Sequence, residues 1–316
     1  MNDILMKNRK VLIAAPVHPV LTEALATMGY EFIINEKVTQ ASALEVVGEC
    51  VGIITSTRLQ LDKALIDAAP NLEWIGRMGS GMEVIDVPYA ESKGIRCIGS
   101  PEGNCNAVGE HALGMLLALT RRIAVSNTEM KQGVWLRDEN RGIELENKTI
   151  GIIGYGHTGA AFAKKLSGFD MQVLAYDKYN PHLIPQGITN CKNLDPIFEN
   201  ADIISFHVPH GRATFHYFNE TFLAAMHKPF IIINTSRGSV VSINDLYNGI
   251  AAKKIVGACL DVFETEPVSK MPAEMAAQMR ELITLPNVIT TPHIAGYTFE
   301  ALFKMSKILA EKIYMR

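Results

Sequence analysis

Three side chains that could carry out proton chemistry follow three separate apolar runs late in the chain. Arg237, Glu266 and His293 each come a few residues after such a run, and each run is typical of a short β-strand. In parallel sheets, ligands bind outside the carboxyl ends of the strands. We therefore expect the three side chains to meet at one edge of a sheet.

These three residue types together suit the reversible reduction of a 2-keto acid. Arginine offers a planar, permanently charged group for the substrate carboxylate and carbonyl oxygen. Histidine gives and takes protons near neutral pH, and a neighbouring carboxylate would stabilise its charged form and orient it. Singly, Arg237 could form a surface ion pair, Glu266 could be a solvated loop acid and His293 a structural residue. Their joint position downstream of a dinucleotide motif favours function.

The dinucleotide motif is a G-x-G-x-x-G loop that follows a β-rich run and precedes a helix-like run. Its first glycine permits a tight turn, its second lets backbone approach a pyrophosphate, and its third lets the helix pack on the strand. The histidine within it is expected to contribute its backbone only. The residues that we assign to this loop are Gly154, Gly156, His157, Thr158 and Gly159.

A carboxylate stands where a dinucleotide-binding unit places one for the ribose. Asp177 ends the next predicted strand, about 20 residues beyond the glycine loop, where it can bind a ribose 2′-hydroxyl. Its charge would repel the 2′-phosphate of NADP, although the neighbouring Lys178 could attract one. The alternative is an ordinary aspartate in a turn. We expect NAD as the cofactor.

Short apolar runs alternate with helix-length segments along the chain, a pattern typical of parallel sheets covered by helices. The predicted strands are residues 11–15, 32–34, 51–55, 72–75, 95–98, 149–153, 172–176, 203–206, 230–233, 255–260 and 288–290. The predicted helices are residues 20–28, 41–47, 62–68, 87–92, 107–120, 160–166 and 300–314. We predict an α/β protein with two Rossmann-like domains, each a doubly wound parallel sheet, and a final helix that returns to the first domain.

The segment 107–120 is apolar on nearly all sides and too short to cross a bilayer. Such a helix must be buried in a core or in a subunit interface. We favour the interface.

Composition limits the classes of function. The chain has 316 residues, 48% of them hydrophobic, and a formal net charge of only -3, so neither a nucleic acid nor a membrane surface is an expected partner. Its five cysteines are widely spaced and lack a C-x-x-C pair, which argues against a disulfide framework or a metal site. We expect a cytoplasmic protein with no metal.

The motifs together resemble the D-isomer-specific 2-hydroxyacid dehydrogenase family. The resemblance covers almost the whole chain and rests on the glycine loop and on runs 79–81, 104–112, 234–238, 261–267 and 292–296. It implies that Arg237, Glu266 and His293 form the catalytic triad. It also implies that the cofactor cleft includes His207, Val208, Pro209, Thr235, Asp261 and Gly296, with Thr235 and Asp261 near the nicotinamide.

The resemblance further implies a discontinuous, flavodoxin-like substrate domain and a central cofactor domain. We predict the substrate domain over residues 1–102 plus 294–316 and the NAD-binding domain over residues 103–293. A homodimer joined largely through the 107–120 helix is expected, in agreement with the apolar character of that segment.

The substrate end of the site points toward phosphorylated acids. In the family, the loop corresponding to Gly79, Ser80 and Gly81 offers backbone N–H groups to the substrate carboxylate, and glycines allow that close approach. Arg58 and Arg77 stand where the phosphoglycerate dehydrogenase branch carries basic residues, although both could be exposed charges on a domain rim. If they bind phosphate, the reaction is the oxidation of 3-phospho-D-glycerate, the entry to serine synthesis. The chain leaves no room for an appended regulatory domain, so we expect no feedback through one.

Three other functions fit the scaffold. A glyoxylate or hydroxypyruvate reductase (D-glycerate dehydrogenase) is the main alternative and would differ in its turnover of unphosphorylated acids. An NAD-sensing co-repressor is disfavoured because no Pro/Ser-rich tail is visible. Formate dehydrogenase is disfavoured because it has glutamine where Glu266 stands.

Overall fold

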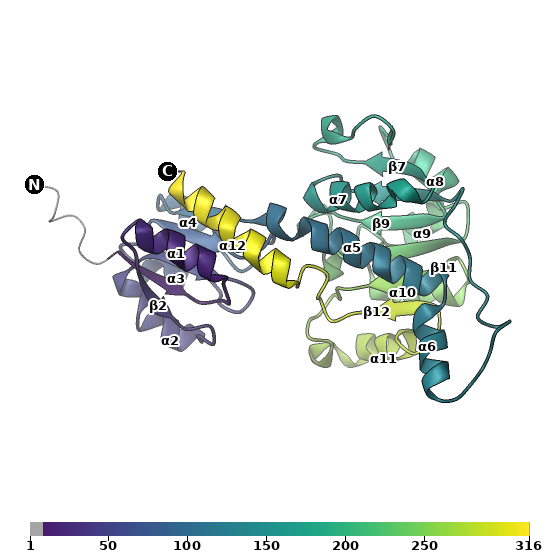
Figure 1. Cartoon of the computed structure of the whole chain (residues 1–316), viewed down its shortest axis with the longest axis horizontal. Helices are drawn as coiled ribbons and strands as arrows, with labels where there is room; N and C mark the ends of the chain where they lie inside the picture. Colours follow the sequence, from purple (N-terminus) through teal and green to yellow (C-terminus); the bar gives the residue numbers. More distant parts are fainter. Residues whose placement is uncertain (1–8, 316) are drawn as a thin grey trace, which may run out of the picture. The chain divides into compact units, whose positions relative to one another are not determined.

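The computed structural model describes residues 9–315 and divides the chain into two compact units (Figure 1). One comprises the described residues up to Asn104 together with those from Tyr297 onward, and the other runs from Cys105 to Gly296. Residues 1–8 and 316, at the outer ends of the predicted substrate domain, lie outside the described residues. The division at 104/105 falls within one long helix.

The first unit is built on a five-stranded parallel sheet in the order β2-β1-β3-β4-β5. This is the flavodoxin-like order, and the strand order reverses between β1 and β3. The buried apolar side chains of the strands account for the sheet's position between two helical layers. The strands are β1 (Lys10–Ile13), β2 (Glu31–Ile34), β3 (Cys50–Thr55), β4 (Trp74–Arg77) and β5 (Arg96–Gly99).

The C-terminal helix completes this unit by packing beside the first helix (Figure 1). Leu309 of that helix lies against Gly76 of β4, where an added Cβ would meet its side chain. Near the start of the first helix, the backbone N–H of His18 donates to Ser306 Oγ. The helices are α1 (Pro19–Thr27), α2 (Gln40–Leu44), α3 (Lys63–Asp67), α4 (Val87–Ser92) and α12 (Phe299–Tyr314), with a 3₁₀ turn at Val47–Glu49. The predicted return of the final helix is confirmed.

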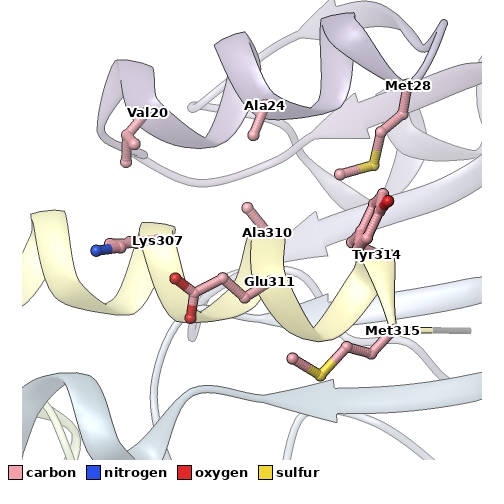
Figure 2. A pocket seen from close by; sticks show the side chains of 8 residues that line it. All are labelled: Val20, Ala24, Met28, Lys307, Ala310, Glu311, Tyr314 and Met315. Atoms are coloured by element: carbon pink, nitrogen blue, oxygen red, sulfur yellow. The ribbon is translucent and has the colours of Figure 1, made fainter.

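An open groove of about 290 Å³ lies between the surfaces of α1 and α12 (Figure 2). Apolar side chains from both helices line most of it, and Lys307 and Glu311 add charge on the α12 side. None of the residues that line it belongs to the site described below.

The second unit is built on a seven-stranded parallel sheet in the order β12-β11-β10-β9-β6-β7-β8. From the central β6 the chain first moves to β7 and β8 and then returns to add β9 to β12 on the other side. The reversal between β6 and β9 is where such sheets bind their ligands. The strands are β6 (Thr149–Ile153), β7 (Gln172–Tyr176), β8 (Thr189–Asn190), β9 (Ile203–Phe206), β10 (Phe230–Asn234), β11 (Ile255–Leu260) and β12 (Val288–Thr290).

Helices cover both faces of this sheet (Figure 1). Two apolar clusters, one on each face, bury the strand side chains. The helices are α5 (Pro101–Thr120), α6 (Ile123–Lys131), α7 (His157–Lys165), α8 (Asp195–Asn200), α9 (Glu220–Ala225), α10 (Ile243–Ala251) and α11 (Ala273–Leu282). Short 3₁₀ turns lie at Leu166–Gly168, Pro181–Leu183, Gly238–Val240 and Val268–Lys270.

Helix α5 differs from its prediction in two ways. It begins at Pro101, six residues before the apolar segment that marked it, because Glu102 and proline suit a first turn. Only one of its faces is buried in the unit. Ala112 and Leu116 are fully buried, whereas Leu113 and Leu117 are partly exposed.

The predicted α/β class and both parallel sheets are confirmed. All eleven predicted strands exist, but β4 starts at Trp74 and not at Leu72. The prediction missed β8 and five helices of the second unit, because helices this short depend on packing more than on their own sequence pattern. No helix within residues 9–315 is long and apolar enough to cross a membrane.

Candidate active site

The glycine loop lies at the point where the strand order of the second unit reverses. It joins β6 to α7. His207 directly follows the neighbouring β9, and its N–H donates to Ile153 O at 2.8 Å. Gly154 has a φ of +91°, and an added Cβ would overlap the carbonyl of His207. A Cβ at Gly159 would overlap the carbonyl of Gly154, whereas one at Gly156 would meet open space.

This arrangement forms a cradle that a pyrophosphate fits. Gly156 leaves its surface open, and α7 begins at His157, whose side chain is exposed and whose backbone N–H, like that of Thr158, lies in the first turn. Free N–H groups and the helix dipole favour an anion there. The backbone role expected for His157 agrees with this position.

Asp177 directly follows β7 and is hydrogen-bonded to the glycine loop. One carboxylate oxygen accepts the N–H of Tyr155 at 2.7 Å, and the other accepts the N–H groups of Tyr179 at 2.9 Å and Asn180 at 2.7 Å. The carboxylate thus fixes the shape of the loop besides lying where a ribose would bind. The sequence suggested only the second of these roles.

Two buried polar atoms line the same edge without a partner among the described residues: His207 Nδ1 and Thr235 Oγ1. Burial lowers the pKa of His207 to about 3, so its ring is neutral, and Ser205 Oγ lies 2.8 Å from its Nε2. Buried polar atoms in proteins normally have a hydrogen-bond partner. These two suit the polar groups of a bound dinucleotide.

Glu266 and His293 form a hydrogen-bonded pair. Glu266 follows β11 and His293 follows β12, and His293 Nδ1 lies 2.6 Å from Glu266 Oε2. The other carboxylate oxygen, Oε1, accepts the N–H of Phe263 at 3.0 Å, which fixes the orientation of the carboxylate. Both side chains are partly exposed, so a substrate can reach the imidazole.

The environment shifts both pKa values in the direction that favours an ion pair. The hydrogen bond that His293 donates to Glu266 raises the pKa of His293 above its ordinary value. Burial and the charge of Arg237 oppose this rise, while the charges of Glu266 and Asp261 add to it. Burial opposes ionisation of Glu266, but hydrogen bonds from His293 and the Phe263 N–H, with the charges of His293 and Arg237, hold its pKa below the ordinary value. The charged, proton-donating form of the imidazole therefore persists to higher pH than in a free histidine.

Arg237 reaches the same neighbourhood from the end of β10. Its Nη1 donates to Ser236 O at 2.7 Å, and its own carbonyl accepts from Asn234 Nδ2 at 2.9 Å. A Cβ at the next residue, Gly238, would overlap the carbonyl of Phe263, so the arginine loop packs directly on the loop that carries Glu266. The three residues predicted from strand ends are thus brought together.

Asp261 makes hydrogen bonds that the sequence did not predict. It is fully buried, and its carboxylate accepts hydrogen bonds from the N–H groups of Ile294 and Ala295, each at 2.8 Å, and from Thr291 Oγ1 at 2.5 Å. His111 Nε2 lies 2.9 Å from the same hydroxyl. Sequence reasoning gave Thr291 and His111 no role, although His111 lies within the 104–112 run and Thr291 directly precedes the 292–296 run.

Within the first unit, Arg77 lies against the predicted substrate loop, whereas Arg58 lies near Glu36. The loop 79–81 follows β4; Gly79 has a φ of +136°, and its N–H donates to Arg77 O and Ser100 Oγ. Arg77 is buried and donates to the carbonyl of Met78, whereas Arg58 is exposed, with Nη1 3.5 Å from Glu36 O. The two arginines therefore turn to different carbonyl groups.

The second unit thus has the parallel sheet and the glycine loop of a dinucleotide-binding domain, and the His293–Glu266 pair follows β12 and β11 of the same sheet. Residues 113–295 match the family model of the D-isomer specific 2-hydroxyacid dehydrogenase NAD binding domain. The chain belongs to the D-isomer specific 2-hydroxyacid dehydrogenases, as the sequence motifs predicted.

The proteins that this chain resembles are named for different substrates. The chain is 33% identical over 310 residues to the hydroxypyruvate reductase of Thermotoga maritima, covering 98% of each chain. It is also 33% identical over 305 residues to the D-3-phosphoglycerate dehydrogenase of Archaeoglobus fulgidus, covering 96% of this chain but only 56% of that protein. The crystal structure of D-lactate dehydrogenase from Aquifex aeolicus, complexed with NAD and lactic acid, superimposes with a TM-score of 0.80 at 27% identity, covering 96% and 94% of the chains.

Proposed function

We propose that the chain catalyses the reversible, NAD-dependent reduction of a small 2-keto acid to a D-2-hydroxy acid. The observation that carries this proposal is the 2.6 Å pair of His293 and Glu266 beside Arg237, on the sheet edge that holds the glycine loop. In reduction, His293 gives a proton to the carbonyl oxygen. In oxidation it takes the proton back, and Glu266 stabilises the charged ring. Arg237 holds the substrate carboxylate and carbonyl.

NAD supplies the hydride acceptor or donor when bound. The glycine loop would hold its pyrophosphate and Asp177 its ribose, while Thr235 and His207 would offer their unpartnered buried atoms. Val208, Pro209, Asp261 and Gly296 would complete the cleft. We retain residues 103–293 as the proposed extent of the NAD-binding domain, and residues 1–102 plus 294–316 as the proposed substrate domain.

For the substrate we propose 3-phospho-D-glycerate, and with it a place in serine biosynthesis, on the basis of Arg58 and Arg77. Gly79, Ser80 and Gly81 would bind the carboxylate through backbone N–H groups. One observation favours the alternative, a glyoxylate or hydroxypyruvate reductase. Arg77 is buried against its own loop, so it would have to turn to reach a phosphate.

A steady-state screen tests the activity and the substrate together. Oxidation of 3-phospho-D-glycerate and D-glycerate with NAD, and reduction of hydroxypyruvate and glyoxylate with NADH, would be compared in the wild type and in Arg58→Ala. Loss of turnover on the phosphorylated acid alone would support the phosphate role. If hydroxypyruvate is turned over faster than 3-phospho-D-glycerate, and Arg58→Ala does not change that rate, the reductase is favoured. Tight NAD binding with no turnover of any acid would overturn the proposal.

Replacing Glu266 by glutamine should move the pH profile of reduction. Because the Glu266 hydrogen bond is the main reason that the pKa of His293 is raised, the wild type should keep its proton donor until the pH rises through that raised pKa. In Glu266→Gln the fall in kcat/KM for glyoxylate should begin at lower pH. Glu274→Gln, an exposed change on α11, is the control, and an unmoved profile in Glu266→Gln would contradict the assignment.

Replacing Asp177 by alanine should relax the preference for NAD over NADP. The variant loses the charge that would repel a 2′-phosphate, and it also loosens the Tyr155 N–H contact that shapes the loop. We expect KM for NADH to rise about tenfold or more, while KM for NADPH falls. Kinetics with both cofactors measure this, and an unaltered ratio would count against the ribose role. Lys178→Ala tests the alternative that this lysine attracts the phosphate.

We also propose that the protein is a cytoplasmic homodimer joined around α5. Leu113 and Leu117 on the partly exposed face of α5 support this, as do large exposed side chains after it: Ile123, Met130, Val134, Trp135, Leu136 and Ile143. Trp135 is 75% exposed, and exposed apolar patches of this kind mark interfaces. Trp135→Glu should shift the mass by light scattering from dimer to monomer.

The cysteines support the cytoplasmic location. Cys50, Cys191 and Cys259 are buried thiols, which suits a reducing compartment.

A further inference from the structure

The buried carboxylate of Asp261 organises the loop that presents His293. Its two oxygens accept two backbone N–H groups, from Ile294 and Ala295, and one hydroxyl, from Thr291. The Asp261 carbonyl also accepts the N–H of His293 at 2.8 Å. A buried charge is stable only when such donors satisfy it. Four hydrogen bonds to one residue therefore fix the backbone from 291 to 295.

The backbone of His293 needs this support because it is strained. Its φ is +55°, in the left-handed region that non-glycine residues enter only at a cost. In that conformation its Nδ1 meets Glu266 Oε2 at 2.6 Å. A loop free to relax to negative φ would turn the ring away from Glu266.

The hydroxyl of Thr291 links this loop to helix α5. A hydroxyl has a single hydrogen, and here the Asp261 carboxylate at 2.5 Å is the strongest acceptor, since the sulfur of Met115 lies 3.9 Å away. The Thr291 oxygen must then accept from His111 Nε2 at 2.9 Å. His111 Nε2 lies 3.7 Å from Asp261 Oδ1, too far for a hydrogen bond, so the link runs through the threonine.

We propose that Thr291 and His111 are positioning residues that hold the His293 loop in its strained conformation through Asp261. The donor order runs from His111 Nε2–H to Thr291 Oγ and from Thr291 Oγ–H to the carboxylate. The inference rests on the proposed function for its effect on turnover, but its geometric part concerns the His293–Glu266 pair alone. The charged groups that face His293 are Glu266, Asp261 and Arg237.

The pKa of His293 reports this positioning without any substrate. Histidine labelled at Cε1 allows the ring to be titrated by NMR in the full-length protein, with His293→Asn to assign its signal. In Thr291→Val, which keeps the shape but removes the hydroxyl, the contact with Glu266 loosens. We expect the pKa of His293 to fall by about 0.5–1 unit. Thr291→Ser keeps the hydroxyl and should retain the wild-type value.

Thr290→Val is the matched control, since the neighbouring Thr290 makes no side-chain hydrogen bond to any residue described by the structure. An unchanged His293 pKa in Thr291→Val, or an equal fall in Thr290→Val, would overturn the proposal. Thermal unfolding confirms that each variant is folded at the temperature of titration.

The role of His111 is tested by a double-mutant cycle. His111→Phe removes the donor and should lower the pKa of His293 less than Thr291→Val does, whereas His111→Gln keeps an N–H donor and should restore it. Because His111 acts through the hydroxyl, adding His111→Phe to Thr291→Val should change the pKa by no more than about 0.2 unit. Additive effects on the pKa of His293 would show that His111 acts independently of Thr291, and would overturn the proposed link through the Thr291 hydroxyl.

Turnover separates this inference from the proposed function. If the wild type reduces glyoxylate or hydroxypyruvate, Thr291→Val should lower kcat about 10–100-fold with little change in KM for NADH, because a small displacement of a catalytic group is costly. If the wild type reduces neither acid and oxidises neither D-glycerate nor 3-phospho-D-glycerate, the proposed function fails, and the titration still decides the positioning role. Full turnover in Thr291→Val would overturn the inference alone.

Discussion

Replacing His293 by asparagine should lower kcat for keto-acid reduction by about 10²–10⁴-fold, the usual contribution of a positioned proton donor. Asparagine is chosen because it enters the left-handed region more readily than most residues, so the strained backbone at φ +55° can persist. The variant keeps a polar side chain but has no group that titrates near neutral pH. The remaining rate should no longer depend on the raised pKa of the imidazole.

The affinity for NADH should stay nearly unchanged in His293→Asn, because the glycine loop and Asp177 lie on other strands of the sheet. Fluorescence titration with NADH measures this, and stopped-flow kinetics measures the hydride step. His182→Asn, an exposed change in the 3₁₀ turn after β7, is the matched control. Wild-type turnover in His293→Asn would rule out the acid–base assignment.

Replacing Arg237 by glutamine should lower kcat/KM for the keto acid by about 10²–10³-fold, comparable with the loss of one donor to a developing oxyanion. Glutamine can still donate hydrogen bonds but brings no charge. Lysine keeps the charge but lacks the planar fork that binds a carboxylate with two N–H groups. Arg237→Lys should therefore also be impaired, chiefly through a raised KM.

Arg237→Gln should also raise the pKa of His293. The charge of Arg237 lowers that pKa, so without this charge His293 should keep its proton to still higher pH. The pH profile of Arg237→Gln should thus move opposite to that of Glu266→Gln. Arg280→Gln on the surface of α11 is the control. Equal kcat/KM in the wild type and Arg237→Gln would exclude a substrate-binding role.

Much of the site is encoded locally, which is why it could be predicted. The apolar run of β6 followed by Gly154, Gly156 and Gly159 specifies a strand, a turn and a helix within a few residues of one another. Arg237 and His293 were identified as strand-end residues in the same way. Short helices such as α9 were missed because helices of this length depend on packing more than on their own sequence pattern.

The sequence by itself determined the α/β class, the strands, the glycine loop and which polar residues end which strands, because these follow from patterns within short windows. Only the tertiary structure decided which loops meet. It placed β9 beside β6, set Glu266 at 2.6 Å from His293, and turned the Asp261 carboxylate onto the His293 loop. It also buried Arg77 against its own loop. The physical reason is that such contacts join residues far apart in the chain, and strand order and side-chain packing fix them together.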